Sequence, residues 1–196
     1  MINEAMGSWW SSYLSALDSA PVPTKTVTSL IITGSGNLLS QIIEGRTAID
    51  WAAVKMYCTW GFILAPLNHV WQNTIATRGP GSSTPLRFLA TIAVDHVLWK
   101  VPIVFCFIAY TKLWAGASPA EALRSATALS RLDGDIQKAS VKAWPLIQVV
   151  NFWLVPLKLR VLYMNSSLLL WIVYLAIKLR SSDPRTGKGE TGRKKQ

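Results

Sequence analysis

Residues 88–113 of this chain read FLATIAVDHVLWKVPIVFCFIAYTKL, and this stretch decides what kind of fold the chain adopts. At about 1.5 Å per helical residue, it is long enough to cross a hydrocarbon core of about 30 Å. Three ionisable residues, Asp95, His96 and Lys100, stand inside it, with Pro102 just after them. Charged groups at this depth are costly, so we expect these side chains to face other helices or water. The stretch therefore predicts a membrane helix packed in a bundle.

Three further apolar runs accompany this stretch along the chain. They occupy residues 26–43, 51–75 and 161–179, and each is long enough, or nearly so, to span a bilayer. The segment RGPGSSTP at 78–85 predicts a loop, because Gly and Pro favour turns. The sequence therefore predicts an all-α integral membrane helical bundle with four transmembrane helices.

The C-terminal apolar region leaves a fifth membrane segment open. Residues 144–179 would form a helix of about 54 Å if unbroken, which exceeds a hydrocarbon core of about 30 Å. We expect a break around Pro156 to Arg160. The first piece, 144–157, is then short for a full span and is expected to be tilted, interfacial or embedded within the bundle.

The first run, 26–43, differs from the others because small residues recur in it at spacings of three and four. Such a stripe lets membrane helices approach closely, although a run rich in Ser and Thr also produces stripes by chance. Asn37 and Gln41 lie one turn apart beside the stripe, and their amides need partners in the bundle. The stripe consists of Thr26, Ser29, Thr33, Gly36 and Ser40.

The composition is that of a membrane protein. Hydrophobic residues make up 51% of the 196 residues and charged residues only 15%, whereas soluble domains are about a quarter charged. The chain contains ten Trp, a residue that favours the interface between water and lipid. Trp9 and Trp10 begin a short amphipathic helix, predicted before Pro21, that would rest at this interface.

The net charge of +10 is spread unevenly along the chain. Residues 181–196 form a basic polar tail with Gly and Pro, which we interpret as disordered. Beside apolar spans, such a tail is expected to lie on an anionic leaflet rather than to bind nucleic acid. The predicted organisation is a single transmembrane helical domain over 1–180 followed by this tail.

No residue pattern in the sequence indicates catalysis or a cofactor. Cys58 and Cys106 are the only cysteines, and they lack the spacing of a metal site. His69 and His96 have no cluster of acidic residues or cysteines at ligand spacing. We therefore expect neither an enzyme nor a metal or cofactor site.

Polar side chains within the apolar runs are the candidate functional residues. Inside a membrane, such groups either line a path for solutes or bond one another and hold helices together. Asp95 needs water or a cation from another segment, such as Arg160, because Lys100 lies off its helix face. The candidates are Asn37, Gln41, Asp95, His96, Lys100, Gln148, Asn151 and Arg160.

The region after Trp144 carries the most specific pattern, W-P-x-x-Q-x-x-N-F-x-x-V-P-x-x-x-R. In it stand Trp144, Pro145, Gln148, Asn151, Phe152, Pro156 and Arg160, and Asn165 and Trp171 follow. Earlier positions fit as well, namely Gly36 with Asn37, Pro66 with His69, and Asp95 with Pro102. With these motifs, the chain resembles the Mpv-seventeen/peroxisomal membrane protein family over nearly its whole length.

The resemblance implies a small four-helix protein of an organelle membrane. The sequence of the chain is more similar to the peroxisomal branch of the family, which implies the peroxisomal membrane. The mitochondrial inner membrane is the alternative location. Two positions depart from the family pattern, which often has Gly-Asp at Gly36-Asn37 and Asp-Gln at Asp95-His96. The first departure removes a buried charge, and the second adds a group that titrates near neutral pH.

The resemblance also implies a passive pore for small solutes, which the polar candidates make physically possible. The alternative is a membrane-organising or adaptor protein whose basic tail is the working part. The expected partners are the lipid bilayer, small-molecule solutes and a second copy of the chain. Deletion of residues 181–196 separates the two functions, because a pore would still conduct and an adaptor would lose its partner.

We predict that protease removes the C-terminal tail from intact organelles. Four spans place both termini on one side of the membrane, and the positive-inside rule places the basic tail in the cytosol. The measurement is an immunoblot of a C-terminal epitope after protease treatment, with detergent-solubilised organelles as the control. A tail that stays protected until detergent is added reverses the orientation.

Overall fold

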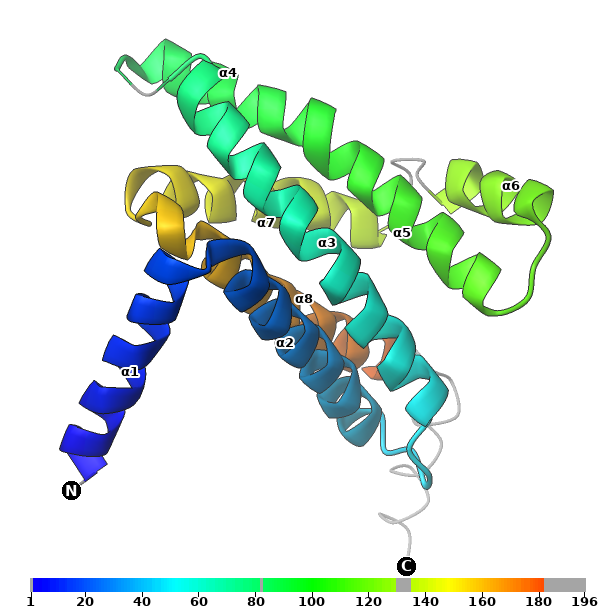
Figure 1. The fold of residues 1–196 in the computed structure, drawn as a ribbon. Helices are drawn as coiled ribbons and strands as arrows, with labels where there is room; N and C mark the ends of the chain where they lie inside the picture. The colour runs from blue at the N-terminus through cyan, green and yellow to red at the C-terminus, as the bar shows by residue number, and fades with distance from the viewer. Residues whose placement is uncertain (1, 82, 130–134, 182–196) are drawn as a thin grey trace, which may run out of the picture.

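The computed structural model describes residues 2–81, 83–129 and 135–181, and these residues form helices without any strand (Figure 1). The prediction of an all-α fold is confirmed for this part of the chain. The helices are α1 (Ile2–Ser19), α2 (Pro21–Ile43), α3 (Trp51–Arg78), α4 (Pro85–Asp95), α5 (Val101–Trp114), α6 (Pro119–Leu129), α7 (Asp135–Trp153) and α8 (Arg160–Ser181).

Helices α2 and α3 form an antiparallel pair whose connection is fixed by side chains. The Gln41 amide accepts from the Asp50 backbone N–H at 2.7 Å and donates to the Asp50 carbonyl at 3.1 Å. Gln41 also donates to Asn37 at 2.8 Å. The Asp50 carboxylate caps α3 by accepting from the Ala53 N–H. Asn37 and Gln41 therefore close the hairpin between α2 and α3.

The small-residue stripe of α2 lies buried between α3 and α8. The Thr33 hydroxyl donates to the Tyr57 carbonyl of α3 at 2.9 Å. A Cβ at Gly61 of α3 would lie 2.7 Å from the Ser29 carbonyl oxygen and would also meet the Thr33 hydroxyl. Gly36 faces α8 instead, where the nearest side chain is that of Ile172. The stripe thus makes α2 the central helix of the bundle.

Helix α4, a π-helical segment (His96–Lys100) and α5 follow one another without a break from Pro85 to Trp114. This 30-residue helix is long and apolar enough to cross a membrane, with a mean hydropathy of 1.8 over an 18-residue window. Within the described ranges, one helical segment meets both criteria, and the predicted run 88–113 lies inside it. The other predicted runs lie on α2, α3 and α8.

The π-helical segment changes the direction in which Lys100 points. Pro102 has no backbone N–H, and the Val101 N–H bonds to the His96 carbonyl five residues back. In this wider turn, residues five apart come to the same side of the helix. Lys100 nevertheless makes no ion pair with Asp95 within the described residues, and its ammonium lies over the Trp144 ring of α7 instead. Lys100 is thus not the partner of Asp95.

The turn from α5 to α6 is encoded in Gly116 to Glu121. Gly116 has φ +85°, which favours glycine, and the Ala117 N–H bonds back to the Lys112 carbonyl at 3.0 Å. Ser118 and Glu121 then form a capping box, in which the Ser118 backbone N–H and hydroxyl both bond the Glu121 carboxylate at 2.9 Å. These bonds lower the pKa of the Glu121 carboxyl. Helix α6 consequently folds back beside α5 (Figure 1).

The long C-terminal apolar region is divided between two helices, as its length requires, but the first helix begins earlier than predicted. Helix α7 begins at Asp135 and ends at Trp153, and a short 3-10 turn over Leu157–Leu159 leads into α8. The predicted break around Pro156 to Arg160 is confirmed, because α7 ends at Trp153 and α8 begins at Arg160. The predicted start of the first piece at 144 was wrong, because α7 already begins at Asp135. The predicted disordered tail lies outside the described residues, apart from Ser181, which ends α8.

Helix α1 projects away from the bundle, with its N-terminus farthest from it, and contacts mainly α2 (Figure 1). Its tryptophans, Trp9 and Trp10, are exposed. Near the bundle, the Asp18 carboxylate accepts from the Lys158 ammonium at 3.1 Å. This placement agrees with the expected amphipathic helix before Pro21.

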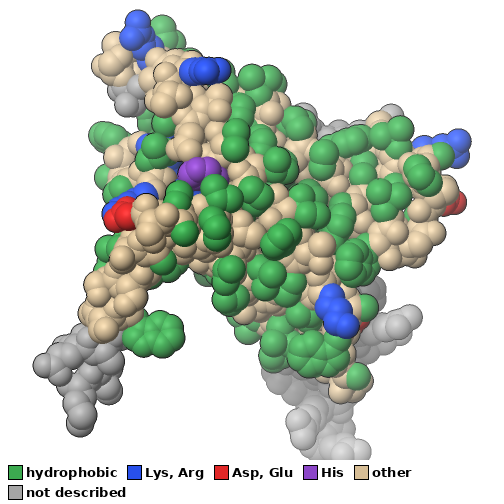
Figure 2. Space-filling view, in the orientation of Figure 1, with side chains coloured by type: hydrophobic (Ala, Val, Ile, Leu, Met, Phe, Trp, Pro, Cys, Tyr) green, Lys and Arg blue, Asp and Glu red, His purple; other side chains and the backbone are tan. Residues whose placement is uncertain are grey.

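Polar residues fill the interior of the bundle and apolar residues cover its outside. Among the described residues, more polar than hydrophobic side chains are buried. Large apolar side chains such as Ile31, Phe62 and Val97 are more than half exposed, and Figure 2 shows hydrophobic side chains spread over the outer surface. This pattern is the reverse of that in a soluble protein and indicates a surface that faces lipid.

We predict that Gly61→Ala destabilises the protein by about 1–3 kcal/mol, because an added methyl group would force α2 and α3 apart. Gly36→Ala is the matched control, since a Cβ there would meet its nearest neighbour at 3.5 Å, an ordinary contact. The measurement is the thermal unfolding midpoint of each purified variant in detergent. Equal midpoints for the two variants would show that close approach at Gly61 contributes nothing.

Candidate functional site

The Asp95 side chain has no exposed surface and binds two other helices. Its carboxylate accepts a hydrogen bond from the Trp71 indole N–H of α3 at 2.7 Å and a short one from the Gln148 amide of α7. Hydrogen bonds to N–H donors stabilise the charged form of a buried carboxylate. Asp95 thus joins α3, α4 and α7 without an ion pair to either partner.

Two residues on α7 extend this network. The Asn151 amide donates to the Gln148 amide oxygen at 2.9 Å. Gln148 and Asn151 are 2% and 0% exposed, respectively, and lie three residues apart on one face of the helix. The Asn151 oxygen has no hydrogen-bond partner among the described residues.

The Trp71 indole that donates to Asp95 is held in place by a second indole ring. Trp71 of α3 and Trp99 of the π-helical segment stack with centroids 5.2 Å apart and planes 4° apart. The Trp99 N–H donates to the Asn68 amide oxygen at 2.8 Å. The stacked pair fixes the position of the Trp71 N–H, so Trp71 is a positioning group for the Asp95 carboxylate.

Lys100 contacts a different aromatic ring, that of Trp144 on α7. Its ammonium is 4.9 Å from the centroid of the Trp144 ring, a favourable cation–π distance. Trp144 in turn packs against Trp171 of α8, with centroids 6.1 Å apart. His96 is half-buried one residue after Asp95. The π-helical segment, α7 and α8 are linked here through the Lys100 ammonium and two indole rings.

Arg160 does not reach Asp95. Its guanidinium donates to the Phe152 and Val155 carbonyls, each at 3.2 Å, and lies over the Phe152 ring. The expectation that Arg160 pairs with Asp95 was wrong, because the break between α7 and α8 leaves carbonyls that a nearby cation satisfies. Pro156 stands within that break, directly before the 3-10 turn.

A second polar group joins α2 to α3. Lys25 is 5% exposed, and its ammonium donates to His69 Nδ1 at 2.9 Å. The other ring nitrogen, Nε2, contacts the Asn73 amide at 3.1 Å. Pro66 lies three residues before His69, within α3.

Several buried amides have atoms without a partner in the described part of the protein. Both polar atoms of Gln72 are unpaired, as is the Asn165 amide nitrogen. Gln72 is 1% exposed and Asn165 is 2% exposed. Unpaired buried polar atoms are unusual and costly, about 1–3 kcal/mol each. Such atoms mark places where an interior must accommodate a further polar group.

These residues belong to one level of the bundle, which we call the polar layer. Asn68 and Gln72 lie one turn apart on α3, and two residues between them reach other helices. Trp71 binds Asp95, and His69 binds Lys25. The polar layer consists of Lys25, Asn68, Gln72, Asp95, Gln148, Asn151 and Asn165.

The structure brings only some of the predicted residues together. Asp95, Gln148 and Asn151 meet in the polar layer, whereas Asn37 and Gln41 lie at the opposite end of α2. Sequence reasoning missed the parts played by Asn68, Gln72 and Lys25. A signal for the first two was present, because Asn68 and Gln72 are spaced by four in an apolar run, so they share one helix face.

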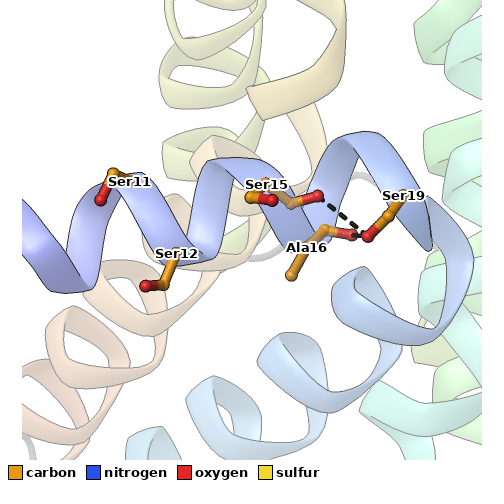
Figure 3. Close-up of a pocket in the computed structure, with 5 residues that line it drawn as sticks. All are labelled: Ser11, Ser12, Ser15, Ala16 and Ser19. Atoms are coloured by element: carbon orange, nitrogen blue, oxygen red, sulfur yellow. Dashed lines mark hydrogen bonds between the residues drawn. The ribbon is translucent and has the colours of Figure 1, made fainter.

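A shallow groove beside α1 is a weaker candidate (Figure 3). It is lined by exposed serines, and the Ser19 hydroxyl bonds the Ser15 carbonyl of the same helix at 2.9 Å. The serines lie along the helix and satisfy their hydrogen bonds locally. The groove offers no charged group, so the polar layer is the better candidate site.

Comparison with known proteins identifies relatives along almost the whole chain. The model of the Mpv17 / PMP22 family matches residues 129–176. Protein sym1 of Aspergillus oryzae is 30% identical over 169 residues, which are 84% of this chain and 94% of that protein. The region matched by the family model includes Gln148, Asn151 and Asn165 of the polar layer.

The names of two other relatives refer to organelle membranes. Peroxisomal membrane protein 2 of Bos taurus is 28% identical over 85% of this chain and 87% of its own length. Mitochondrial inner membrane protein Mpv17 of Caenorhabditis briggsae is 21% identical over 87% of this chain and 92% of its own. No solved structure matches the chain.

We predict that Trp71→Phe destabilises the protein by about 1–3 kcal/mol, because the Asp95 carboxylate loses an N–H donor inside the bundle. Trp114→Phe is the matched control, since Trp114 is 44% exposed and removed from this network. Thermal unfolding of both purified variants in detergent measures the difference. A loss no larger than that of the control would contradict the part assigned to the Trp71 N–H.

Proposed function

Because the chain belongs to the Mpv17 / PMP22 family of membrane proteins, we propose that it forms a passive pore for small polar solutes in an organelle membrane. The names of its relatives support the peroxisomal membrane and the mitochondrial inner membrane equally. The role proposed is transport without catalysis. Its partners are then the bilayer, which surrounds the bundle, and the solutes that enter it.

The proposed topology has four spans. They are α2, α3, the continuous helix from Pro85 to Trp114, and α8. Each carries large exposed apolar residues that suit contact with lipid, for example Ile31 on α2, Leu67 on α3 and Leu170 on α8. Helix α7 contributes Gln148 and Asn151 to the interior, so we place it against the spans rather than apart from them.

The polar layer is the observation that carries the proposal. A solute that leaves water for the bundle interior loses its hydration, and only polar groups of the protein replace it. The unpaired atoms of Gln72, Asn151 and Asn165 are groups of this kind. If they served only to hold helices together, they would be expected to bond one another, as Asp95, Trp71 and Gln148 do.

We predict that Asp95→Asn shifts the ion selectivity of the pore toward anions while the fold is kept. The substitution preserves size and removes one negative charge from the interior, so cations lose an attraction inside the pore. The measurement is the reversal potential in a salt gradient across a planar bilayer containing purified protein. Asp18→Asn, which removes an exposed carboxylate from α1, is the control.

Three results would contradict this account. Identical ion selectivity in a folded, conducting Asp95→Asn variant would remove Asp95 from the pore wall. Failure of that variant to fold would restrict Asp95 to its structural role, in which a buried donor loses its charged partner. Absence of any conductance in the wild-type protein would favour the membrane-organising or adaptor function instead.

A further inference from the structure

We propose that the polar layer contains a binding site for a small soluble oxyanion, a carboxylate or a phosphate, held by Lys25, Asn165 and Gln72. The inference rests on the proposed function, because it names the class of solute that the interior receives. It concerns a different part of the layer from Asp95. Three helices, α2, α3 and α8, each contribute one of the three residues.

Lys25 is a buried cation whose neighbours are neutral. Its side chain is 95% buried, and the one hydrogen bond that the described residues give its ammonium goes to His69. No carboxylate of the described residues lies within 4.0 Å of the Lys25 ammonium. A buried charge without a counter-ion is costly. The two remaining ammonium protons are therefore suited to an anion.

Asn165 presents a free donor close to Lys25. Ser29 lies one turn after Lys25 on α2, so the two side chains share a face, about 5–6 Å apart at Cβ. The Ser29 hydroxyl donates to the Asn165 amide oxygen at 3.3 Å, which turns that oxygen toward α2. The Asn165 amide nitrogen stays buried and unpaired. The residues that carry the ammonium group and the free amide N–H group are thus linked through two positions of α2 that lie one turn apart.

Gln72 supplies the third donor. It lies three residues after His69 on α3, and His69 is the residue that contacts Lys25. Both Gln72 polar atoms are buried without a partner. Its amide nitrogen is therefore a second free N–H donor within one turn of the Lys25 contact.

The charge balance of the layer favours an anion over a cation. Asp95 is the one carboxylate of the polar layer, and its oxygens already accept N–H donors from Trp71 and Gln148. Lys25 has no comparable compensation. An oxyanion accepts several N–H donors at once, and such charge-assisted bonds are about twice as strong as neutral ones. Carboxylate and phosphate groups share this chemistry.

The test is the thermal unfolding midpoint of the purified protein in lipid-free detergent, with inorganic phosphate titrated against chloride at constant ionic strength. We expect phosphate to raise the midpoint of the wild type. Lys25→Gln should weaken the apparent phosphate affinity at least about tenfold, because a buried charged partner is removed. Lys55→Gln is the matched control, since Lys55 is exposed on α3 and should keep the wild-type response.

A second variant keeps the proposal testable if Lys25→Gln does not fold. Asn165→Asp preserves size, replaces the free amide nitrogen with an oxygen and places a negative charge beside Lys25. It should therefore fold and lose the response to phosphate. A wild type that ignores phosphate, or an Asn165→Asp variant that still responds like the wild type, overturns the site.

Two further arms separate the site from its alternatives. Dihexanoyl phosphatidic acid, a soluble lipid, is titrated in the same way, and a response to it without a response to phosphate would assign the site to a lipid headgroup and overturn the proposal. Conductance of the same preparations is measured in planar bilayers. Phosphate binding that depends on Lys25 in a protein without conductance would support the site and reject only the pore.

Discussion

The hydrogen bonds to Asp95 are the interaction on which the rest of the structure depends. A carboxylate with no exposed surface is tolerable in a bundle with an apolar exterior only when N–H donors surround it. Trp71 and Gln148 supply those donors from two other helices. Their positions fix how α3, α4 and α7 meet, and the stack of Trp71 on Trp99 follows from the same requirement. The interior polar residues of α3, α4 and α7 are thus arranged around the Asp95 carboxylate.

Close packing of α2 makes this arrangement possible on the other side of the bundle. Gly61 lets α3 approach the Ser29 carbonyl, and Gly36 faces α8 along the same stripe. Because the three backbones are close, short polar side chains such as Ser29 reach across to Asn165. Small residues therefore bring amides together in the interior, where an apolar interface of larger side chains would have kept them apart. The small-residue stripe of α2 therefore accounts both for the close packing of the helices and for the polar contacts between them.

The sequence predicted the helices better than it predicted their contacts. Apolar runs and the small-residue stripe indicate helices and close approach, because these depend on local composition. The π-helical turn before Pro102 was not predictable from periodicity, and neither was the position of the Lys100 ammonium over the Trp144 ring. Pairing across helices was likewise missed: Arg160 satisfies carbonyls at the end of α7, and the stacked indoles hold Asp95 instead. Partners such as these depend on the tertiary arrangement, which one sequence without related sequences does not give.

The central claim is that the interior of this apolar-surfaced bundle is open to polar solutes. Thiol labelling in membranes tests it most directly, with Gln72→Cys as the interior variant and Leu67→Cys as the lipid-facing variant, both made in a Cys58→Ser, Cys106→Ser background. Only the thiolate reacts with a charged, membrane-impermeant methanethiosulfonate reagent, so labelling reports contact with water. The account predicts that the Gln72→Cys variant is labelled and the Leu67→Cys variant is not. Protection of the Gln72→Cys variant, in a correctly folded protein, would contradict it.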